Sequence, residues 1–174
     1  MVIRADFVQD ELAKSEEWTK VVELADSFEL YMRKKSVAAR ISKANQPGSS
    51  SALIQDVLLE HATKLGFRNE AEGLFKNYKN KRLRPDYFLR LRETGIILEI
   101  ERGKTNQNNM DFLDFWKCHI CKHANYLFLM VPQELRQSAN GAVSKPFNTT
   151  RAHLGAFFED GNYTNVRGLA LFGY

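Results

Sequence analysis

The sequence predicts a mixed α/β fold, in which helices flank one central mixed sheet and a helical segment comes first. Three observations support this class. Apolar residues recur at helical spacing in the first third of the chain, strand-like apolar runs follow, and another helical pattern separates two of those runs. The length of 174 residues fits a single domain, residues 1–174, and suffices to bury a hydrophobic core.

The N-terminal segment, residues 1–47, is expected to be helical. Its apolar residues recur at intervals of three and four, namely Trp18, Val21, Val22, Leu24, Ala25, Phe28, Tyr31 and Met32. Pro47 and Gly48 interrupt this pattern. Ser51 then stands where the N-cap of a second helix belongs, and Gly66 stands where that helix should end.

Strand patterns follow this second helix. The expected strands are residues 67–75, 86–91, 96–101, 126–131 and 169–172. The first of these is ambiguous, whereas Thr94-Gly95 between the second and third is typical of a turn. Residues 111–122 return to helical spacing, and Pro132 ends the buried strand that comes next.

The hairpin made by the second and third strands brings acidic residues together. A two-residue loop, at 93–94 or 94–95, pairs even-numbered positions on one strand with odd-numbered positions on the other. One face is then entirely apolar, and the other carries Asp86, Glu99 and Glu101 near the open end. A register shift of one residue would move Asp86 to the apolar face, so the clean apolar face supports this pairing.

Three carboxylates in a partly buried site repel one another unless a cation neutralises them. A hard divalent ion such as Mg²⁺ prefers carboxylate oxygens together with water and substrate phosphate. There it polarises a phosphoryl group and lowers the pKa of a bound water. The alternative is a solvated sheet face, on which the acids pair with Arg84, Arg90 or Arg102.

Basic residues cluster in two places, although the net charge is only +4 and the isoelectric point about 9.1. Residues 31–45 carry five basic and no acidic side chains, and residues 76–92 carry seven basic ones against Asp86 alone. A phosphate backbone attracts such clusters, and a solvated helix face and loop are the alternative. The expected nucleic-acid contacts are Lys34, Lys35, Arg40, Lys81, Arg82, Arg84, Arg102 and Lys117.

Pro85-Asp86, a short gap, and then Glu99-Ile100-Glu101 at the end of an apolar strand resemble the PD-(D/E)XK signature of restriction-endonuclease-like nucleases. The order of helix, hairpin, helix and strand over residues 51–132, the expected nuclease core, is similar to the core of that family. The resemblance implies a restriction-endonuclease-like fold, a Mg²⁺ or Mn²⁺ cofactor, and metal ligation by Asp86 and Glu99.

The third position of the signature is usually lysine, and here it is Glu101. A minority of type II restriction enzymes that resemble this pattern carry glutamate there, where it acts as a metal-linked general base. Lys104 either supplies the missing positive charge or contacts a phosphate or solvent. Many family members place a glutamate on the helix before the first strand. Glu60, at the margin of that helix's apolar stripe, either fills this role or is simply solvated.

Other site types fit the sequence less well. A phosphate-binding loop at Gly103-Lys104-Thr105 is excluded because it needs glycine where Leu98 stands. Cys118 and Cys121 give half a zinc site in a chain with two cysteines. No signal-peptide pattern, membrane span or organic-cofactor motif is recognised, and a cytoplasmic protein is expected.

The expected function is that of a Mg²⁺-dependent endonuclease acting on the phosphodiester bonds of DNA. A homodimer is expected, because duplex DNA has two strands to cut. The alternative from another class is a non-catalytic DNA-binding or assembly module of the same fold. Within the enzymes, a structure-specific resolvase or an RNA nuclease is the alternative.

Overall fold

A computed structural model describes residues 1–69, 84–103, 106, 108–136 and 141–174 of the chain. Its described strands form a six-stranded sheet in the order β1-β8-β5-β4-β3-β2. These strands are β1 (Ile3–Val8), β2 (Arg68–Asn69), β3 (Tyr87–Arg90), β4 (Gly95–Ile100), β5 (Tyr126–Val131) and β8 (Gly168–Gly173). β5 runs parallel to both of its neighbours, β4 and β8, while the other pairs are antiparallel.

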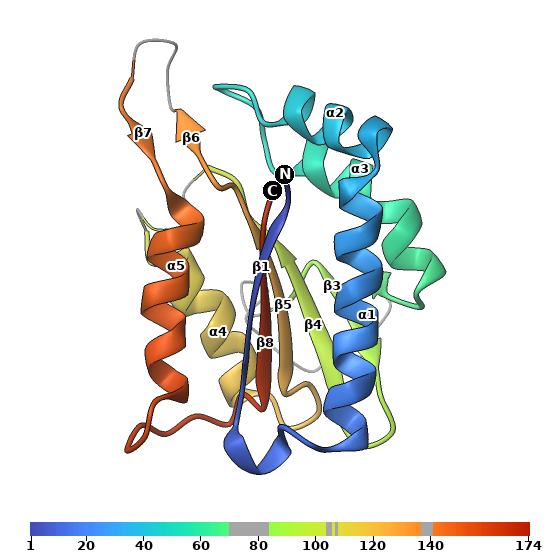
Figure 1. Cartoon of the computed structure of the whole chain (residues 1–174), viewed down its shortest axis with the longest axis vertical. Helices are drawn as coiled ribbons and strands as arrows, with labels where there is room; N and C mark the ends of the chain where they lie inside the picture. The colour runs from blue at the N-terminus through green and yellow to red at the C-terminus, as the bar shows by residue number, and fades with distance from the viewer. Residues whose placement is uncertain (70–83, 104–105, 107, 137–140) are drawn as a thin grey trace.

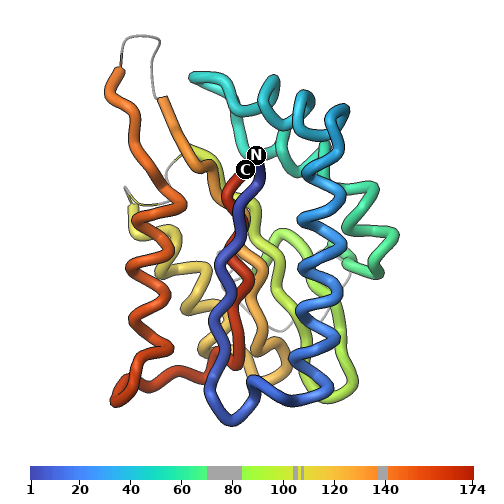
Figure 2. Tube along the Cα trace, in the orientation of Figure 1, coloured from blue at the N-terminus to red at the C-terminus, as the bar shows by residue number. Residues whose placement is uncertain are grey.

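Helices cover both faces of this sheet, as Figures 1 and 2 show. α1 (Glu16–Arg33), α2 (Lys35–Ala44) and α3 (Ala52–Lys64) pack on one side, and α4 (Met110–Ile120) and α5 (Pro146–Gly155) pack on the other. The predicted class, a mixed sheet flanked by helices, is therefore confirmed. The short elements are η1 (Asp10–Leu12), η5 (Ala156–Phe158) and a separate ribbon of β6 (Leu135–Arg136) and β7 (Val143–Ser144).

Two hydrophobic cores result from the alternation of side chains along the central strands. Ile96, Leu98 and Ile100 of β4 pack toward α1 and α3, whereas Ile97 packs toward α4. Glu99 alternates with its neighbours in the same way and so shares the face of Ile97. None of the helices in the described ranges has both the length and the apolar character that crossing a bilayer requires.

Local signals account for several helix ends. Ser15 caps α1, because its Oγ accepts the backbone N–H of Trp18 at 3.1 Å. Ser51 stands at the N-cap of α3 as predicted, but its side chain makes no capping hydrogen bond. Gly66 ends α3 as predicted, with a φ of 93° that favours glycine.

The β3–β4 hairpin has the predicted facing but a different loop. Leu91 donates its backbone N–H to the Thr94 carbonyl at 2.8 Å, so the two-residue loop is Arg92-Glu93 rather than 93–94 or 94–95. A loop of even length preserves which residues share a face. Tyr87 accordingly lies opposite Leu98. One residue further from the loop, Asp86 lies opposite Glu99, and its backbone N–H donates to the Glu99 side chain.

β1 is the main departure from an N-terminal segment expected to be helical. Residues Ile3–Val8 pair antiparallel with β8 along the edge of the sheet. The short run contains Arg4 and Asp6, which form an ion pair at 3.1 Å, and its pattern alone is too weak to indicate a strand. Pairing with a segment more than 150 residues away stabilises it, and such long-range pairing leaves no local signal.

Gly95 lies at the close approach of the two hairpin strands. A Cβ atom there would lie 2.4 Å from Cε2 of Phe88 and 2.7 Å from the carbonyl oxygen of Leu89. We therefore expect Gly95→Ala to lower the free energy of unfolding by about 1–3 kcal/mol through overpacking, measured by urea unfolding. At Gly103 an added Cβ meets nothing within 4 Å, so Gly103→Ala is the matched control. Equal unfolding midpoints for both variants would contradict this interpretation.

Candidate active site

Four carboxylates and one ammonium group gather beside the end of β4, on the face of the sheet that α4 covers. Asp86 directly precedes β3, Glu99 lies in β4, and Glu101 follows it. Asp114 and Lys117 lie three positions apart on α4, which places them on one side of that helix. We call these five residues the carboxylate cluster.

Asp86 is held by hydrogen bonds from two elements. Its Oδ2 accepts the backbone N–H of Ile100 at 3.0 Å and the side-chain N–H of Gln55 at 2.9 Å. Its own backbone N–H donates to Oε2 of Glu99 at 3.2 Å. Burial raises the pKa of Asp86, an effect that the Ile100 N–H and the charge of Lys117 oppose. The two predicted metal ligands, Asp86 and Glu99, are thus in direct contact.

Lys117 bridges two buried carboxylates. Its Nζ lies 2.8 Å from Oε1 of Glu99 and 2.9 Å from Oδ1 of Asp114, and the three side chains are 7%, 3% and 0% exposed. Burial, and then the charge of Asp114, raises the pKa of Glu99 well above its usual range. Burial also raises the pKa of Asp114 to about 6, against the opposing effect of Lys117. Burial alone would lower the pKa of Lys117, but its two partners outweigh that effect and raise it.

Glu101 lies at the edge of the carboxylate cluster. Its backbone is fixed at both ends, because its N–H donates to the Met130 carbonyl at 2.9 Å and its carbonyl accepts the Tyr174 hydroxyl at 2.6 Å. Burial, followed by the charges of Asp114 and Asp86, raises the pKa of the Glu101 carboxyl to about 8.

The acids of this cluster outnumber its cations. Within the part of the chain that the structure describes, Lys117 is the one cationic side chain paired with Glu99 and Asp114. Among the same residues, Oδ2 of Asp114 is buried and has no hydrogen-bond partner. A buried carboxylate oxygen without a partner is costly, and the proximity of further acids adds to that cost.

This set of donors fits a hard divalent cation. Carboxylate oxygens are the ligands that Mg²⁺ and Mn²⁺ prefer, and a bound ion would provide a partner for Oδ2 of Asp114. No group of three acidic, histidine or cysteine side chains in the described ranges is already arranged as a cage around one point. The carboxylates would therefore have to turn toward the ion as it binds.

Two residues that were predicted to contact nucleic acid are buried. Lys117 belongs to the carboxylate cluster, and Arg102 is 4% exposed. Arg102 donates from Nη1 to the carbonyl of Ser49 at 2.7 Å and from Nη2 to the carbonyl of Gln46. It thereby ties the loop between α2 and α3 to the end of β4. Direct phosphate contacts by these two residues stay predictions.

The predicted basic contacts on α2 are accessible. Lys35 and Arg40 are exposed on this helix, and Lys34 is exposed at its N-cap. Figure 1 shows α2 at the end of the sheet toward which β4 and β5 run, which is also the end where Glu101 lies. Arg84 is half-buried. Three other predicted site residues, Lys81, Arg82 and Lys104, lie outside the described residues.

Gln55, rather than Glu60, is the α3 side chain in contact with the carboxylate cluster. The Glu60 side chain is 69% exposed and forms an ion pair with Lys64 at 2.7 Å. No contact that the described residues make joins Glu60 to Asp86, whereas Gln55 donates to it directly. A catalytic role for Glu60 stays a prediction.

Sequence patterns miss two members of this arrangement, Asp114 and Gln55. The sequence does contain a signal for Asp114. The spacing of Asp111, Asp114 and Lys117 puts three charged groups on one side of an amphipathic helix, whose apolar side has to be buried against the sheet. Gln55 has no comparable signal, since a neutral amide beside an apolar stripe is common on helix surfaces.

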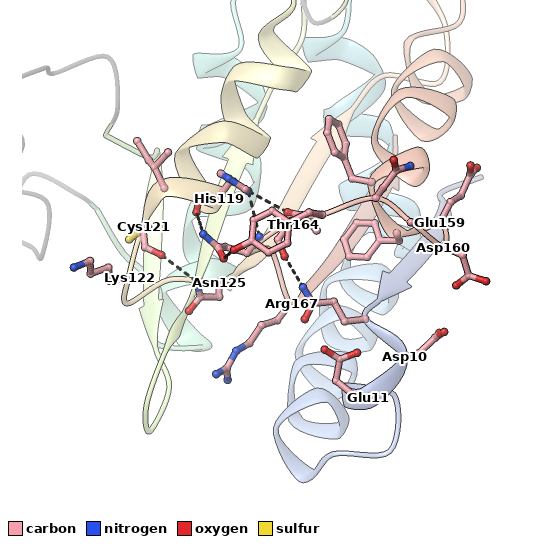
Figure 3. A pocket seen from close by; sticks show the side chains of 18 residues that line it. Asp10, Glu11, His119, Cys121, Lys122, Asn125, Glu159, Asp160, Thr164 and Arg167 are labelled. Carbon is pink, nitrogen blue, oxygen red and sulfur yellow. Dashed lines mark hydrogen bonds between the residues drawn. The ribbon is translucent and has the colours of Figure 1, made fainter.

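A separate hollow of about 750 Å³ lies at the opposite end of the sheet, where β5 and β8 begin (Figure 3). His119 is near its centre and accepts the backbone N–H of Asn165 through Nδ1 at 3.2 Å. Gln9 donates to the carbonyls of Thr164 and Val166 at 2.8 and 3.1 Å. These polar groups bind other parts of the chain, so the carboxylate cluster is the better candidate for chemistry.

No protein-family model and no curated protein matches the sequence. Two solved structures show an approximate likeness. The crystal structure of restriction endonuclease BglII complexed with a DNA 16-mer is 14% identical, with a TM-score of 0.47 over 99% of this chain and 77% of that chain. The crystal structure of free BglII is also 14% identical, with a TM-score of 0.39 over 99% and 78%. A likeness of this degree assigns no role to an individual side chain.

Proposed function

We propose that the protein is a Mg²⁺-dependent endonuclease that hydrolyses the phosphodiester bonds of DNA. The observation that supports this most is the carboxylate cluster, in which the single ammonium of Lys117 faces two buried and two half-buried acids within the described part of the chain. Strongly perturbed acids in such a cluster are typical of sites that bind a cation or move a proton. The resemblance of Pro85-Asp86 and Glu99-Ile100-Glu101 to the PD-(D/E)XK signature supports the same chemistry.

Asp86 and Glu99 would hold the ion. When bound there, Mg²⁺ supplies charge that polarises a phosphoryl oxygen and stabilises the leaving oxygen. Glu101 would orient the attacking water and accept its proton, because its half-buried carboxyl lies at the edge of the carboxylate cluster. Lys104, outside the described residues, is the other candidate for this third catalytic position.

DNA is the proposed substrate because the exposed basic side chains lie at the same end of the sheet as the acids. Lys34, Lys35 and Arg40 would contact phosphates on one side of the site. The basic segment before β3, residues 76–84, adds charge of the same sign close in sequence to Asp86. We further propose a homodimer, in which two such sites face the two strands of a duplex.

The direct test is incubation of the purified protein with supercoiled plasmid and Mg²⁺. We expect nicked and linear products, and none when EDTA replaces the metal. Binding without cleavage, unchanged by Asp86→Ala, would instead indicate a non-catalytic DNA-binding module. Parallel assays on a linear duplex, a four-way junction and RNA separate a general endonuclease from a resolvase or an RNA nuclease.

Gln55 gives a more specific prediction. Gln55→Ala removes the side-chain hydrogen bond to Oδ2 of Asp86, so we expect the cleavage rate to fall roughly 10-fold or more, as it does when a hydrogen bond that orients a metal ligand is lost. Glu60→Ala is the matched control on the same helix and should change the rate less than about 2-fold, because Glu60 is exposed. A larger loss of rate at Glu60 than at Gln55 would contradict this prediction and show that α3 contributes through Glu60. Initial rates of plasmid nicking provide the measurement.

A further inference from the structure

Lys117 pairs with a carboxylate that a divalent cation would also need. Its Nζ lies 2.8 Å from Oε1 of Glu99, which is one of the proposed ligands, and 2.9 Å from Oδ1 of Asp114. Mg²⁺ lies at about 2.0–2.1 Å from its carboxylate oxygens. An ion on the same Glu99 oxygen would therefore be within a few ångströms of the ammonium, where burial leaves little water to screen the repulsion.

Asp114 provides a second and independent observation. Its side chain is fully buried, and Oδ1 accepts the contact with Lys117. Oδ2 has no partner among the described residues. Burial keeps bulk water from hydrating this oxygen, and its charge makes a cation the partner that it favours.

We propose, building on the endonuclease function proposed above, that Lys117 is an internal counter-ion that competes with the divalent cation for Glu99 and Asp114. In the metal-free protein the ammonium neutralises both carboxylates. When the cation binds, both carboxylates transfer from the ammonium to the ion, and Asp114 becomes a ligand in addition to Asp86 and Glu99. A purely structural ion pair between α4 and β4 is the alternative, and it predicts that Lys117 stays in place.

Removing the competitor tests this directly. We expect Lys117→Met to bind Mn²⁺ at least 10-fold more tightly than the wild type, measured by calorimetric titration of the metal-free protein. Lys20→Met is the matched control, because Lys20 is an exposed lysine paired with Glu23 at 2.9 Å and its loss changes the net charge equally. If Lys117→Met binds Mn²⁺ no more tightly than Lys20→Met, the competition is overturned.

The role of Asp114 has its own variant. Asp114→Asn keeps the size of the side chain but removes its charge, so we expect at least 10-fold weaker Mn²⁺ binding. The single variant Lys117→Met leaves two buried carboxylates without their cation and could fail to fold. The double variant Lys117→Met/Asp114→Asn removes one charge of each sign, so it provides the same test with less unpaired charge. Tighter binding by the double variant than by Asp114→Asn supports the competition, and equal or weaker binding overturns it.

The wild-type protein offers a readout without mutation. Acetylation of lysines by a small reagent, followed by mass spectrometry, reports how accessible each ammonium is. Because the Lys117 side chain is buried against Glu99 and Asp114, we expect its labelling to rise at least 5-fold when Ca²⁺ is added, while that of the exposed Lys20 stays constant. Unchanged or lower labelling of Lys117 would indicate a structural ion pair.

Plasmid cleavage by the wild type, measured in parallel, separates the two proposals. Cleavage without tighter Mn²⁺ binding by Lys117→Met overturns the counter-ion role and leaves the endonuclease function standing. Tighter Mn²⁺ binding by Lys117→Met, with no cleavage of any nucleic acid by the wild type, supports the counter-ion role of Lys117 and refutes the proposed endonuclease function.

Discussion

Asp86→Asn is expected to reduce Mg²⁺-dependent plasmid cleavage by roughly 10³-fold or more while the protein stays folded. The amide oxygen of asparagine still accepts the N–H groups of Ile100 and Gln55, so the local structure is retained. The negative charge that would hold the cation is lost. Single-turnover rates of plasmid nicking, together with the melting temperature of the variant, separate loss of activity from loss of fold.

Asp56→Asn is the control for this experiment, because Asp56 is an exposed acid on α3, one position after Gln55. It should cleave at nearly the wild-type rate. If Asp86→Asn retained more than about a tenth of the wild-type rate, Asp86 would not be a metal ligand and the proposed site would have to be abandoned.

The metal-free protein is expected to lose stability as pH rises from 7 to 9. The pKa of the Glu101 carboxyl is about 8 in the folded state, whereas an unfolded glutamate titrates near 4.3. The folded state therefore binds more protons across this interval, and the stabilising contribution, complete below the unfolded pKa, disappears as pH rises through 8. For this one group the loss is on the order of 1 kcal/mol between pH 7 and pH 9. Urea unfolding in EDTA at the two pH values measures it.

Glu101→Gln should remove most of that pH dependence. It should also make the metal-free protein more stable than the wild type at pH 9, by roughly 2–4 kcal/mol, because no charge has to be buried there. Glu93→Gln, in the exposed hairpin loop, should leave the pH dependence unchanged. A Glu101→Gln variant that is less stable than the wild type at pH 9 would show that the Glu101 carboxylate is not under electrostatic strain. Adding Mg²⁺ at pH 9 should stabilise the wild type more than this variant.

The hairpin illustrates what the sequence can predict. The side-chain period of a strand is two, so any loop of even length puts Asp86 on the side of Glu99. The predicted position of the loop was wrong by at least one residue. Because the loop still has an even length, Asp86 and Glu99 share a face as predicted. Likewise, the continuous apolar run of residues 126–131 was sufficient to predict β5, which is buried on both faces.

Contacts between distant segments were beyond the reach of sequence patterns. β1 exists because residues 3–8 pair with β8, and Lys117 joins the acids because α4 packs across the sheet. Local periodicity identifies neither partner, so Lys117 was assigned to the DNA contacts and Asp114 to none. The acids that share one hairpin were predictable. The spacing of Asp114 and Lys117 indicates that they share a side of α4, but not that this side faces the hairpin, and Gln55 on α3 has no such signal.

The link from Arg102 to the loop between α2 and α3 has a consequence for how this region tolerates change. Both acceptors are main-chain carbonyls, those of Gln46 and Ser49, so the guanidinium does not depend on which side chains the loop carries. The contact therefore does not constrain the side chains of the loop, but Gly48, with a φ of 82°, favours glycine. Deleting one residue would pull a carbonyl out of reach of the guanidinium. Substitutions in this loop that keep Gly48 and the number of residues should therefore leave the link between Arg102 and the loop intact.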